Sequence, residues 1–472
     1  MIEGLQPYAE YKETGQEWLG RLPSHWSLLP NRALFEEVKD RNHPNEEMLS
    51  VTITRGIVRQ KSLLSDTAKK DSSNLNKGAY KLVQPGDIAY NKMRAWQGAL
   101  GASSLRGIIS PAYVVMRPRA QASPVFYHHL YRTPAFAKEA ERWSYGITSD
   151  MWSLRPEHFK VIYSALPPPD EQAAIVRFLD HANRKIDGFI RAKRKLIALL
   201  GEQKQAIIHR AVTRGLDPNA PLKPSGIPWL GDIPKHWEVW RLGRVIKLIT
   251  GFPFKSEGFT QKDSAVRLLR GINVTPSGLR WETTVRWERT EGDGLDDFAL
   301  DEGDIVLGMD RPIIASGVRA TRVETRDVPS LLLQRVARLR PTEKIDGGFL
   351  LLLLQGKLFA DYMAPIFTGV SVPHLSPEQI RGFKVMLPPV PEQQEIVAFI
   401  EGETSTLNTA IARTEREIAL MQEYRTRLTA DVVMGKLDVR PAAALLPALP
   451  DEAAAEPLPE EAEEELEPEE IL

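Results

Sequence analysis

The sequence predicts an α+β protein built as an internal duplication. It would contain two α/β-type globular domains and two long helices that pair antiparallel as a coiled-coil spacer, with pseudo-twofold symmetry between the halves. Two observations support this fold class: two short motifs each occur twice in the same order, and the second motif is followed each time by a long helical pattern with heptad spacing. A chain of 472 residues is also too long to fold around one compact core, and its length is typical of two or three domains.

The repeat is found by aligning the chain with itself. The first motif matches at seven of thirteen positions between residues 14–26 (TGQEWLGRLPSHW) and 225–237 (SGIPWLGDIPKHW), a shift of 211. The second matches at eight of thirteen between residues 166–178 (LPPPDEQAAIVRF) and 387–399 (LPPVPEQQEIVAF), a shift of 221. The second intervening segment is therefore ten residues longer, so the ends repeat whereas the middles diverge.

A long helix is expected after each Leu-Pro-Pro. The prolines prevent extension backwards, and Asp170 and Glu171 put negative charge on the first turn, where it suits the helix dipole. Each helix should run for about 43 residues, about 65 Å, and end at Gly215 or Gly435. Polar breaks fall at Lys193 and Gln203. The apolar residues that recur in steps of three and four, typical of a coiled-coil seam, are Ile175, Leu179, Ala182, Ile186, Phe189, Leu196, Leu200 and Ile207 in the first copy and Ile396, Ile400, Leu407, Ala410, Met421, Tyr424 and Leu428 in the second.

The segments between these motifs have short β-like runs and turns. Each contains a Gly-Asp turn that leads into a strand, in QPGDIAYNKMR (84–94) and in DEGDIVLGMDR (301–311). Each closes with a loop and a short helix, at residues 144–159 and 367–380. They are interpreted as two globules of one type with different surfaces.

These patterns divide the chain into five parts, which are listed in chain order. They are an N-terminal globular domain (1–167), a first spacer helix (168–214), a C-terminal globular domain (215–388), a second spacer helix (389–436) and an acidic tail (437–472) that we interpret as disordered.

The formal charge of −1 hides an uneven distribution. Residues 451–472 carry 11 acidic side chains and no basic ones, so the rest of the chain holds 61 basic residues against 51 acidic ones. A cationic body of this kind is compatible with a polyanionic partner. The tail is interpreted as a solubilising end, with mimicry of DNA phosphates as the alternative.

Other features of composition exclude several classes. With no cysteine, the chain has no disulfides or thiolate zinc sites, which fits a reducing cytosol, and we expect a cytoplasmic protein. No apolar run approaches the roughly 18 residues that span a bilayer, and the N-terminus lacks the features of a secretion signal.

No catalytic constellation is apparent. The phosphate loops GxxxxGK[ST] and GxGxxG are absent, and so is the tetrapeptide of amino-methyltransferases. A nuclease-like acid-x-Lys occurs at Glu37–Lys39, but the Pro-Asp that a nuclease has upstream of it is missing. No pair of histidines has the HExxH spacing of a zinc site. His25-Trp26 and His236-Trp237 recur at equivalent positions, and we expect packing features there, with each Trp buried and each His hydrogen-bonded.

The chain contains two variable globules, which begin near LPSHW and IPKHW. Each globule is followed by LPPxxEQ, a long helix and GLD or GKLD. In this layout the chain strongly resembles the specificity subunit of type I restriction–modification systems. The resemblance covers residues from about 14 to 440. It implies two target-recognition domains held apart by two antiparallel spacer helices. It also implies a non-catalytic role, in which each recognition domain reads one half of a gapped double-stranded DNA target.

The resemblance further implies partners and cofactors. Two modification subunits would dock on the spacer and methylate adenine N6, and motor-nuclease subunits would join them for cleavage. S-adenosylmethionine, ATP and Mg would be bound by these partners, with no cofactor, metal or membrane contact for this chain. The helix residues that would lie at this partner interface are Glu171, Gln172, Ile175, Leu179, Ile186, Glu392, Gln393, Ile396, Ile400 and Leu407.

Candidate DNA-contacting residues are polar, basic or aromatic residues in the loops of each globule, because such groups contact phosphates or read base edges. The first globule offers Asn91, Lys92, Arg94, Trp96, Tyr145, Ser149 and Trp152. The second offers Arg270, Asn273, Arg311, Gln334, Arg335, Ser371 and His374. Each of these is alternatively an ordinary turn or surface residue.

Two other functions remain open. A coiled-coil scaffold would bind proteins without reading DNA, and would show no salt-dependent affinity for duplex DNA. A stand-alone methyltransferase or nuclease would be active by itself, but its motifs are missing.

Overall fold

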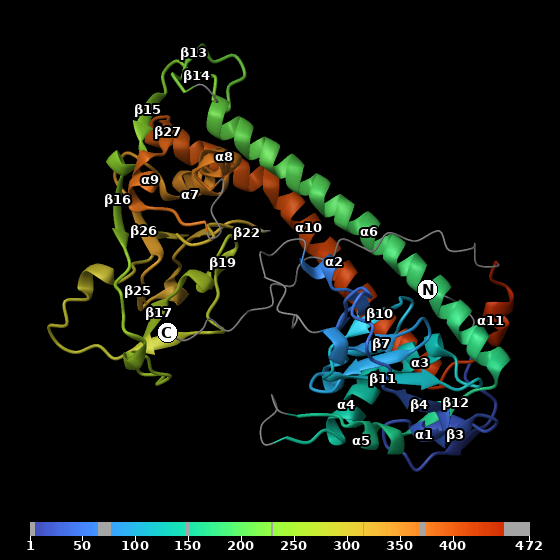
Figure 1. Cartoon of the computed structure of the whole chain (residues 1–472). Coiled ribbons are helices and arrows are strands. Elements are labelled where there is room, and N and C mark those ends of the chain that lie inside the picture. Colours follow the sequence, from blue (N-terminus) through green and yellow to red (C-terminus); the bar gives the residue numbers. More distant parts are fainter. Residues whose placement is uncertain are drawn as a thin grey trace. The chain divides into compact units, whose positions relative to one another are not determined.

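The computed structural model describes residues 5–64, 77–146, 152–227, 230–314, 316–367 and 373–447. The chain forms two compact units (Figure 1): the first comprises residues 1–194 and 416–472, and the second residues 195–415. Each unit contains one globule and a stretch of both long helices, so the helices are not a separate body between two domains. Residues 448–472 of the tail lie outside the described residues, so the structure does not test the prediction that the tail is disordered.

The first globule is built around an antiparallel four-stranded sheet. Its strand order is β4 (Phe35–Val38), β11 (Tyr113–Pro118), β8 (Ile88–Asn91) and β9 (Leu100–Ala102). The helices are α1 (Asn31–Leu34), α2 (Lys61–Leu64), α3 (Pro124–Tyr131), α4 (Pro134–Arg142) and α5 (Pro156–Val161). The remaining strands pair as β1 (Tyr11–Glu13) with β2 (Arg21–Pro23), β3 (Ser27–Pro30) with β12 (Tyr163–Leu166), β5 (Leu49–Thr52) with β6 (Gly56–Arg59) and β7 (Lys81–Val83) with β10 (Gly107–Ile109).

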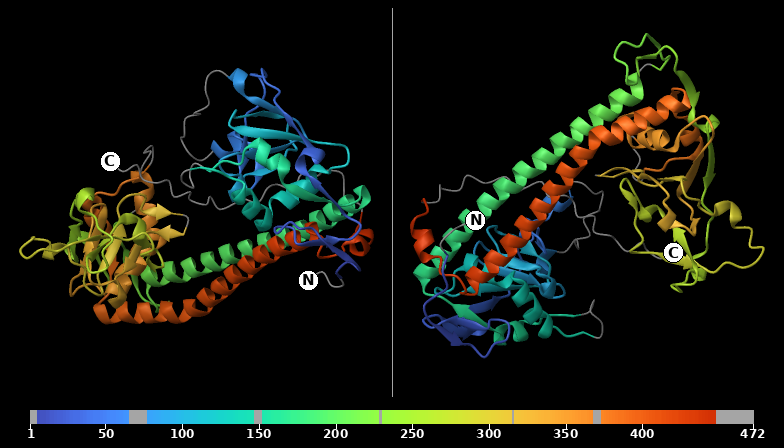
Figure 2. Two further views of the ribbon diagram at one scale, coloured as in Figure 1. Left: turned by 90° about the horizontal axis from the view of Figure 1, so that it is seen from below. Right: turned by 180° about the vertical axis from the view of Figure 1, so that it is seen from behind.

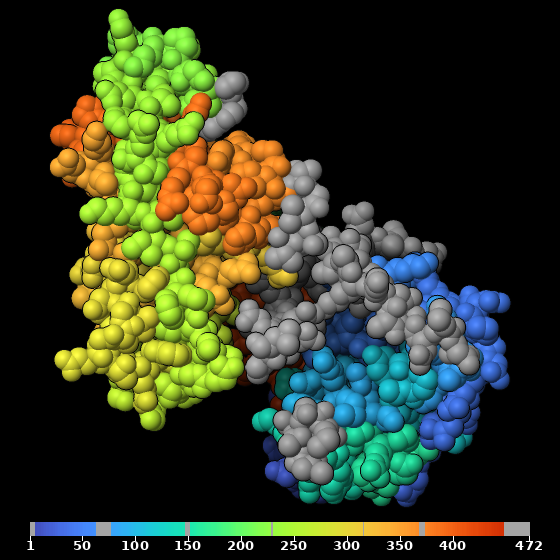
Figure 3. Space-filling model, turned by 60° about the vertical axis from the view of Figure 1, so that its left-hand side comes forward, coloured from blue at the N-terminus to red at the C-terminus, as the bar shows by residue number. Residues whose placement is uncertain are grey.

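The second globule repeats this frame. Its four-stranded sheet has the order β16 (Ile246–Thr250), β26 (Val336–Pro341), β21 (Ile305–Gly308) and β24 (Ala320–Arg322). Helices α7 (Gly347–Gln355), α8 (Lys357–Met363) and α9 (Pro377–Gly382) correspond to α3, α4 and α5. The equivalents of the outer pairs are β13 (Leu222–Pro224) with β14 (Asp232–Pro234) and β15 (Glu238–Arg241) with β27 (Lys384–Leu387). Because β15 pairs with β27, the green start and the orange end of this globule form one continuous surface (Figure 3).

The Gly-Asp turn found in the sequence is a structural element of both sheets. Gly86 and Gly303 both have φ of 90°, a conformation that favours glycine. The following carboxylates form bidentate ion pairs with the neighbouring strand, Asp87 with Arg117 at 2.9 and 3.0 Å and Asp304 with Arg340 at 2.6 and 2.8 Å. The turn therefore sets where the central strand begins in both units.

The globules differ in the parts added to this frame. The second contains a three-stranded sheet of β20 (Val285–Trp287), β17 (Val266–Leu269) and β25 (Ser330–Leu332), and the hairpins β18 (Val274–Thr275) with β19 (Gly278–Leu279) and β22 (Ile313–Ile314) with β23 (Gly317–Val318). The first contains β5–β6 and β7–β10 instead. The divergent middles of the sequence are these additions.

The long helices are α6 (Pro169–Arg214) and α10 (Val390–Val433), which lie side by side in all ribbon views (Figures 1 and 2). In the first unit Asp187 bonds Arg425, and Lys193 Nζ lies 2.6 Å from Glu417 Oε2. In the second, Lys204 Nζ donates to Asn408 Oδ1 at 2.8 Å. From one of these contacts to the next, the residue number on α6 increases while the residue number on α10 decreases. The helices are therefore antiparallel, as predicted. Gly215 and Gly435 end the helices with φ of 71° and 73°, which confirms the predicted stops.

One part of the predicted seam is wrong. Leu196 is 39% exposed, and the residues that turn inward around it are Lys193, Ile197 and Leu200. The seam therefore contains Ile197 in place of Leu196 and Lys204 in place of Gln203, whereas Lys193 lies in it as the predicted polar break. It tolerates these lysines because each has a polar partner on α10.

The predicted start of the tail at residue 437 is also too early. Residues 440–444 form α11 (Arg440–Ala444), and Val439 and Ala443 are buried in the core of the first unit. This packing orders the chain beyond the second long helix.

Within the described ranges, no single helix is long and apolar enough to cross a membrane. The bent pair Gly347–Gln355 and Lys357–Ile366 reaches such a composition, but its leucines contribute to the core of the second unit.

The first unit should be the more acid-sensitive because of two histidines on α3. Burial lowers the pKa of His128 to about 3 and of His129 to about 4, and His128 Nδ1 accepts a hydrogen bond from Ala102 N at 3.2 Å. The unfolded chain takes up these protons near pH 6.5, whereas the folded chain does not, so stability falls as the pH drops below 6.5. The loss should reach about 2 kcal/mol per histidine at pH 5.

His128→Asn retains an acceptor but removes one titrating group, and should reduce the acid-induced loss by about half. The loss of stability between pH 7.5 and pH 5 is measured by urea unfolding, with hydrogen exchange used to follow each unit separately. His209→Asn, at an exposed position on α6, is the control. An unchanged pH dependence in His128→Asn would contradict the assignment.

Candidate nucleic-acid interface

Two loops meet at the end of the central strand in the first unit. We call residues 92–99, which follow β8, the post-strand loop, and residues 143–146 and 152–155, the described residues before α5, the pre-helix loop. Leu154 N donates to the carbonyl of Lys92 at 2.9 Å, and the rings of Trp96 and Trp152 pack edge to face with centroids 5.5 Å apart. Loops that are about 60 residues apart in sequence therefore form one surface.

The second unit repeats this arrangement. Its post-strand loop (309–312) follows β21, and its pre-helix loop, described at residues 367 and 373–376, precedes α9. Leu375 N donates to the carbonyl of Met309 at 2.8 Å, the equivalent of the Leu154–Lys92 bond. The loops are therefore positioned by the same backbone contact in both units, although their side chains differ.

Most candidates of the first globule lie on or beside this loop pair. Arg94 is exposed and Tyr145 is 64% exposed, with its backbone paired to Ser153. Trp96 and Trp152 are half-buried against each other. The remaining three candidates have other roles or no described position: Lys92 contributes its carbonyl to the loop junction, Asn91 Oδ1 accepts from Met93 N at 3.0 Å, and Ser149 lies outside the described residues.

In the second globule, Arg311, Gln334, Arg335 and His374 are exposed residues of the loop pair and the adjoining turn before β26. Ser371 lies outside the described residues. Arg270 is half-buried, and its guanidinium donates to the carbonyl of Thr283.

Asn273 requires a correction. Its side chain is 1% exposed, its Oδ1 accepts from Arg270 N at 3.0 Å and its Nδ2 donates to the carbonyl of Arg280 at 2.8 Å. Because both ends of the amide stabilise the local backbone, Asn273 is a structural residue and not a DNA-reading one.

Asp310 lies at the centre of the second loop pair and was not among the residues predicted from the sequence. Its Oδ1 accepts from Arg335 Nη1 at 3.1 Å and from His374 Nδ1 at 2.6 Å. The available signal was its place directly after the repeated Gly-Asp strand, one residue before Arg311.

Backbone conformation distinguishes this cluster from an ordinary surface ion pair. Arg311 and Arg335 have φ of 44° and 70°, a left-handed region that is unfavourable for arginine. Such residues cost about 1–3 kcal/mol each, whereas an exposed ion pair contributes about 0–1 kcal/mol. The cluster therefore does not serve stability, and conformations of this kind concentrate at functional sites.

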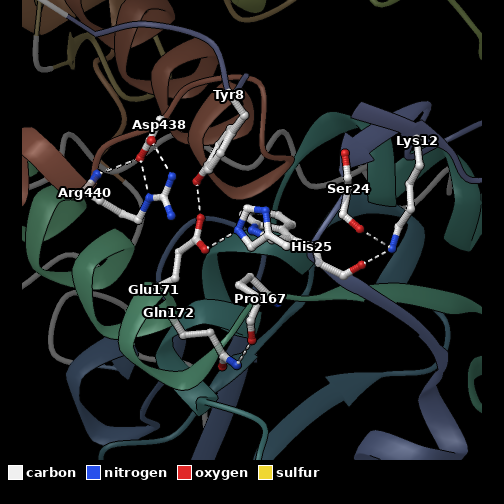
Figure 4. A network of polar contacts seen from close by, with 10 residues as sticks. Tyr8, Lys12, Ser24, His25, Pro167, Glu171, Gln172, Asp438 and Arg440 are labelled. Atoms are coloured by element: carbon white, nitrogen blue, oxygen red, sulfur yellow. Dashed lines mark hydrogen bonds and ion pairs between the residues drawn. The ribbon is translucent and has the colours of Figure 1, made fainter. Parts of the chain in front are cut away.

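The start of α6 is tied to the first globule by a polar network (Figure 4). The side chain of Glu171 is 2% exposed and accepts from Tyr8 Oη and, at 2.8 Å, from His25 Nε2. Burial and the bond to Glu171 raise the pKa of Tyr8, so its hydroxyl remains a donor. The guanidinium of Arg440 lies 5.2 Å from the Tyr8 ring centroid and pairs with Asp438, whose pKa it lowers.

The start of α10 uses the equivalent glutamate and histidine in the second unit. His236 Nε2 and Trp237 Nε1 donate to Glu392 at 2.8 and 3.0 Å. Trp26 and Trp237 are both 0% exposed, which confirms the packing role predicted for the His-Trp pairs.

The glutamines beside these glutamates perform a second equivalent function. Gln172 accepts from Ser123 N and donates to the carbonyl of Pro167, both at 2.8 Å. Gln393 accepts from Asp346 N at 2.8 Å and donates to the carbonyl of Pro388 at 2.9 Å. Each therefore links a long helix to the start of α3 or α7.

These contacts change the interpretation of the proposed partner-interface residues. Eight of them are buried inside their own unit: Glu171, Gln172, Ile175, Leu179, Ile186, Gln393, Ile396 and Ile400. Glu392 and Leu407 are half-buried. Since the buried side chains hold the helices to the globules and to each other, a partner would have to contact other positions on α6 and α10.

Among the described residues, no three His, Asp or Glu side chains converge as a metal site would require.

Comparison with known proteins agrees with this architecture. Residues 234–418 match the family model for the type I restriction modification DNA specificity domain. The chain is 27% identical over 263 residues to the type I restriction enzyme EcoAI specificity subunit of Escherichia coli, covering 55% of this chain and 44% of that one. It is 28% identical over 283 residues to the MjaVIII specificity subunit of Methanocaldococcus jannaschii, covering 60% and 64%. The matches thus span less than two thirds of these two relatives.

Two further comparisons cover more of the chain. The putative type I restriction enzyme MjaX specificity subunit of Methanocaldococcus jannaschii is 21% identical over 469 residues, covering 93% of this chain and 100% of that one. A solved structure described as a study of complex assembly and conformational transition of the type I R-M system has the same fold, with a TM-score of 0.58 and 15% identity over 87% of this chain and 98% of that one.

The structure is thus that of a duplicated protein, and residues 234–418 match the type I restriction modification DNA specificity domain. The chain is thus similar to type I restriction enzyme specificity subunits in sequence, and it shares the fold of a solved protein of a type I R-M system.

Glu171→Gln and Glu392→Gln form a matched test of the two helix starts. Both remove a carboxylate bonded to a histidine, but the Glu171 side chain is 2% exposed and the Glu392 side chain 25%. We expect Glu171→Gln to destabilise the first unit by about 1–3 kcal/mol and Glu392→Gln to have a smaller effect on the second. Urea titration read by hydrogen exchange of each unit checks this order, and equal losses would contradict it.

Proposed function

We propose that this chain recognises a gapped double-stranded DNA target for a type I restriction–modification complex. Each globule reads one half of the target through its loop pair. The spacer helices dock the modification subunits, which methylate adenine N6 with S-adenosylmethionine, and the motor-nuclease subunits join through that complex. This chain itself is the non-catalytic reader.

The observation that carries the proposal is one frame with two different surfaces. The Leu154–Lys92 and Leu375–Met309 bonds hold equivalent loops in equivalent places. The first surface presents Arg94 and an aromatic pair, whereas the second presents the Asp310 cluster. A protein that holds two equal partners over two unequal half-sites needs this combination of repeated frame and unequal surfaces.

The helices offer equivalent exposed positions for such partners. Leu199 on α6 and Leu420 on α10 are related by the repeat shift of 221, and are 52% and 62% exposed. Each follows an alanine that is also exposed, in the shared tripeptide Ile-Ala-Leu. Two identical subunits require two equivalent surfaces, and these leucines supply apolar area outside the buried seam.

An exchange of residues 238–386 for the corresponding segment of a relative tests the two-reader proposal. Methylome sequencing of cells that carry the chain and its modification partner should reveal a gapped motif in which one half changes and the other is retained. A change in both halves, or in neither, would contradict it. A scaffold that does not read DNA would give no sequence-specific methylation at all.

Substitution of the equivalent leucines tests the docking proposal. Leu199→Asp or Leu420→Asp should weaken one site by at least about tenfold, so that native mass spectrometry detects one bound modification subunit instead of two. The double variant should bind none. Leu445→Asp, at a position 88% exposed outside the long helices, is the control. Two bound subunits in the double variant would disprove these positions.

A further inference from the structure

Three separate chain segments are joined around Asp310 in the second unit. The Asp310 carboxylate receives hydrogen bonds from Arg335 and His374 at one oxygen, Oδ1. Backbone bonds connect the same segments: Met309 N donates to the carbonyl of Arg335 at 2.9 Å, and Arg311 N to that of Pro373 at 2.8 Å. The orientation of Arg335 is therefore restricted both through its backbone and through its guanidinium.

The first unit has the same positions without this chemistry. In the sheets, Asn91 lies opposite Tyr113 and Gly308 opposite Val336, which aligns Met93 with Asp310 and Ala112 with Arg335. The equivalent loop bonds align Ser153 with His374. The frame does not require the acid, the arginine or the histidine, so the group is specific to the second surface.

We propose that Arg335 reads a guanine in the half-site of the second unit, and that Asp310 is the positioning residue that directs it. This inference rests on the proposed function and names one base of its target. Guanine presents two acceptors, O6 and N7, in the major groove, and the forked guanidinium of arginine pairs with both. One of the five N–H donors of Arg335 is bonded to Asp310, and no other described residue takes the remaining donors, which can pair with the base.

The carboxylate favours a base edge over a phosphate. A phosphate bound by Arg335 would lie near the negative charge of Asp310, which repels it, whereas a base edge is uncharged. The side chains of Arg335, Asp310 and His374 are 58%, 37% and 39% exposed, so the group is accessible. Because a carboxylate can only accept, His374 Nδ1 donates to Asp310 and leaves the other edge of the imidazole ring at the same surface.

The backbone supports the same conclusion. Arg335 has φ of 70° in the short turn between β25 and β26, where glycine would be unstrained. An arginine retained there at a cost to stability is explained by a contact that only its side chain can make.

The test uses the full chain in complex with its modification subunits and the target found by methylome sequencing. Each guanine of the second half-site is replaced in turn by 7-deazaguanine, which lacks the N7 acceptor, and the Kd of each duplex is measured. We expect one replacement to weaken wild-type binding about tenfold or more and to have no effect on Arg335→Ala. Asp310→Asn should reduce the discrimination at that guanine and increase the affinity for unrelated duplex DNA.

Two further variants separate reading from folding. Arg335→Gly should unfold at the same or a higher temperature than wild type but lose the response to 7-deazaguanine. Arg326→Ala is the matched control, because Arg326 is also an exposed arginine paired with a carboxylate, Glu324, in the same unit. It should retain the response.

The inference and the proposed function fail in different ways. If the complex binds its target but no guanine depends on Arg335, or if Arg335→Ala weakens all duplexes equally, the inference is overturned and the proposed function stands. If the wild-type complex shows no sequence-dependent binding, both are overturned.

Discussion

The contact on which the rest of this structure depends is the glutamate–glutamine pair at the start of each long helix. Glu171 and Glu392 accept from the histidines of the opening motifs, while the adjacent glutamines join the helices to α3 and α7. A carboxylate withdrawn from water is stable only if donors replace its hydration. The helix start and the globule start therefore form together, which explains why the two motifs repeat as a set.

The two units meet this requirement differently. In the first, the donors to Glu171 include Tyr8, and the chain around Arg440 and Asp438 packs over the same tyrosine. In the second, Trp237 supplies its indole N–H to Glu392. The end of the opposite long helix closes each site, since Gly435 lies against Trp26 and Gly215 against Trp237. A Cβ on Gly435 would lie 2.5 Å from Pro23, so glycine is required there for close packing as well as for its φ.

The same division between a constant frame and variable additions runs through the globules. The Gly-Asp turn and its arginine pair place the central strand, and the bond from Leu154 or Leu375 places the loops beyond it. Because these contacts involve backbone atoms and a few buried side chains, exposed loop residues can change without loss of the fold. The left-handed arginines of the second unit show that the surface can even include strained residues, since the frame beneath it is stable.

The sequence by itself determined the duplication, the two antiparallel helices, their glycine stops and the burial of the tryptophans in the His-Trp pairs, because all of these depend on local periodicity or on motifs with one conformational solution. Only the tertiary structure decided which polar residues meet. In the folded chain Asn273 is buried, and most of the helix residues predicted to contact partners are buried inside their own unit. Asp310 lies in contact with Arg335 and His374. The physical reason is clearest for Asp310, which is joined to Arg335 and His374 across 25 and 64 positions of the chain, because no local pattern encodes such a contact.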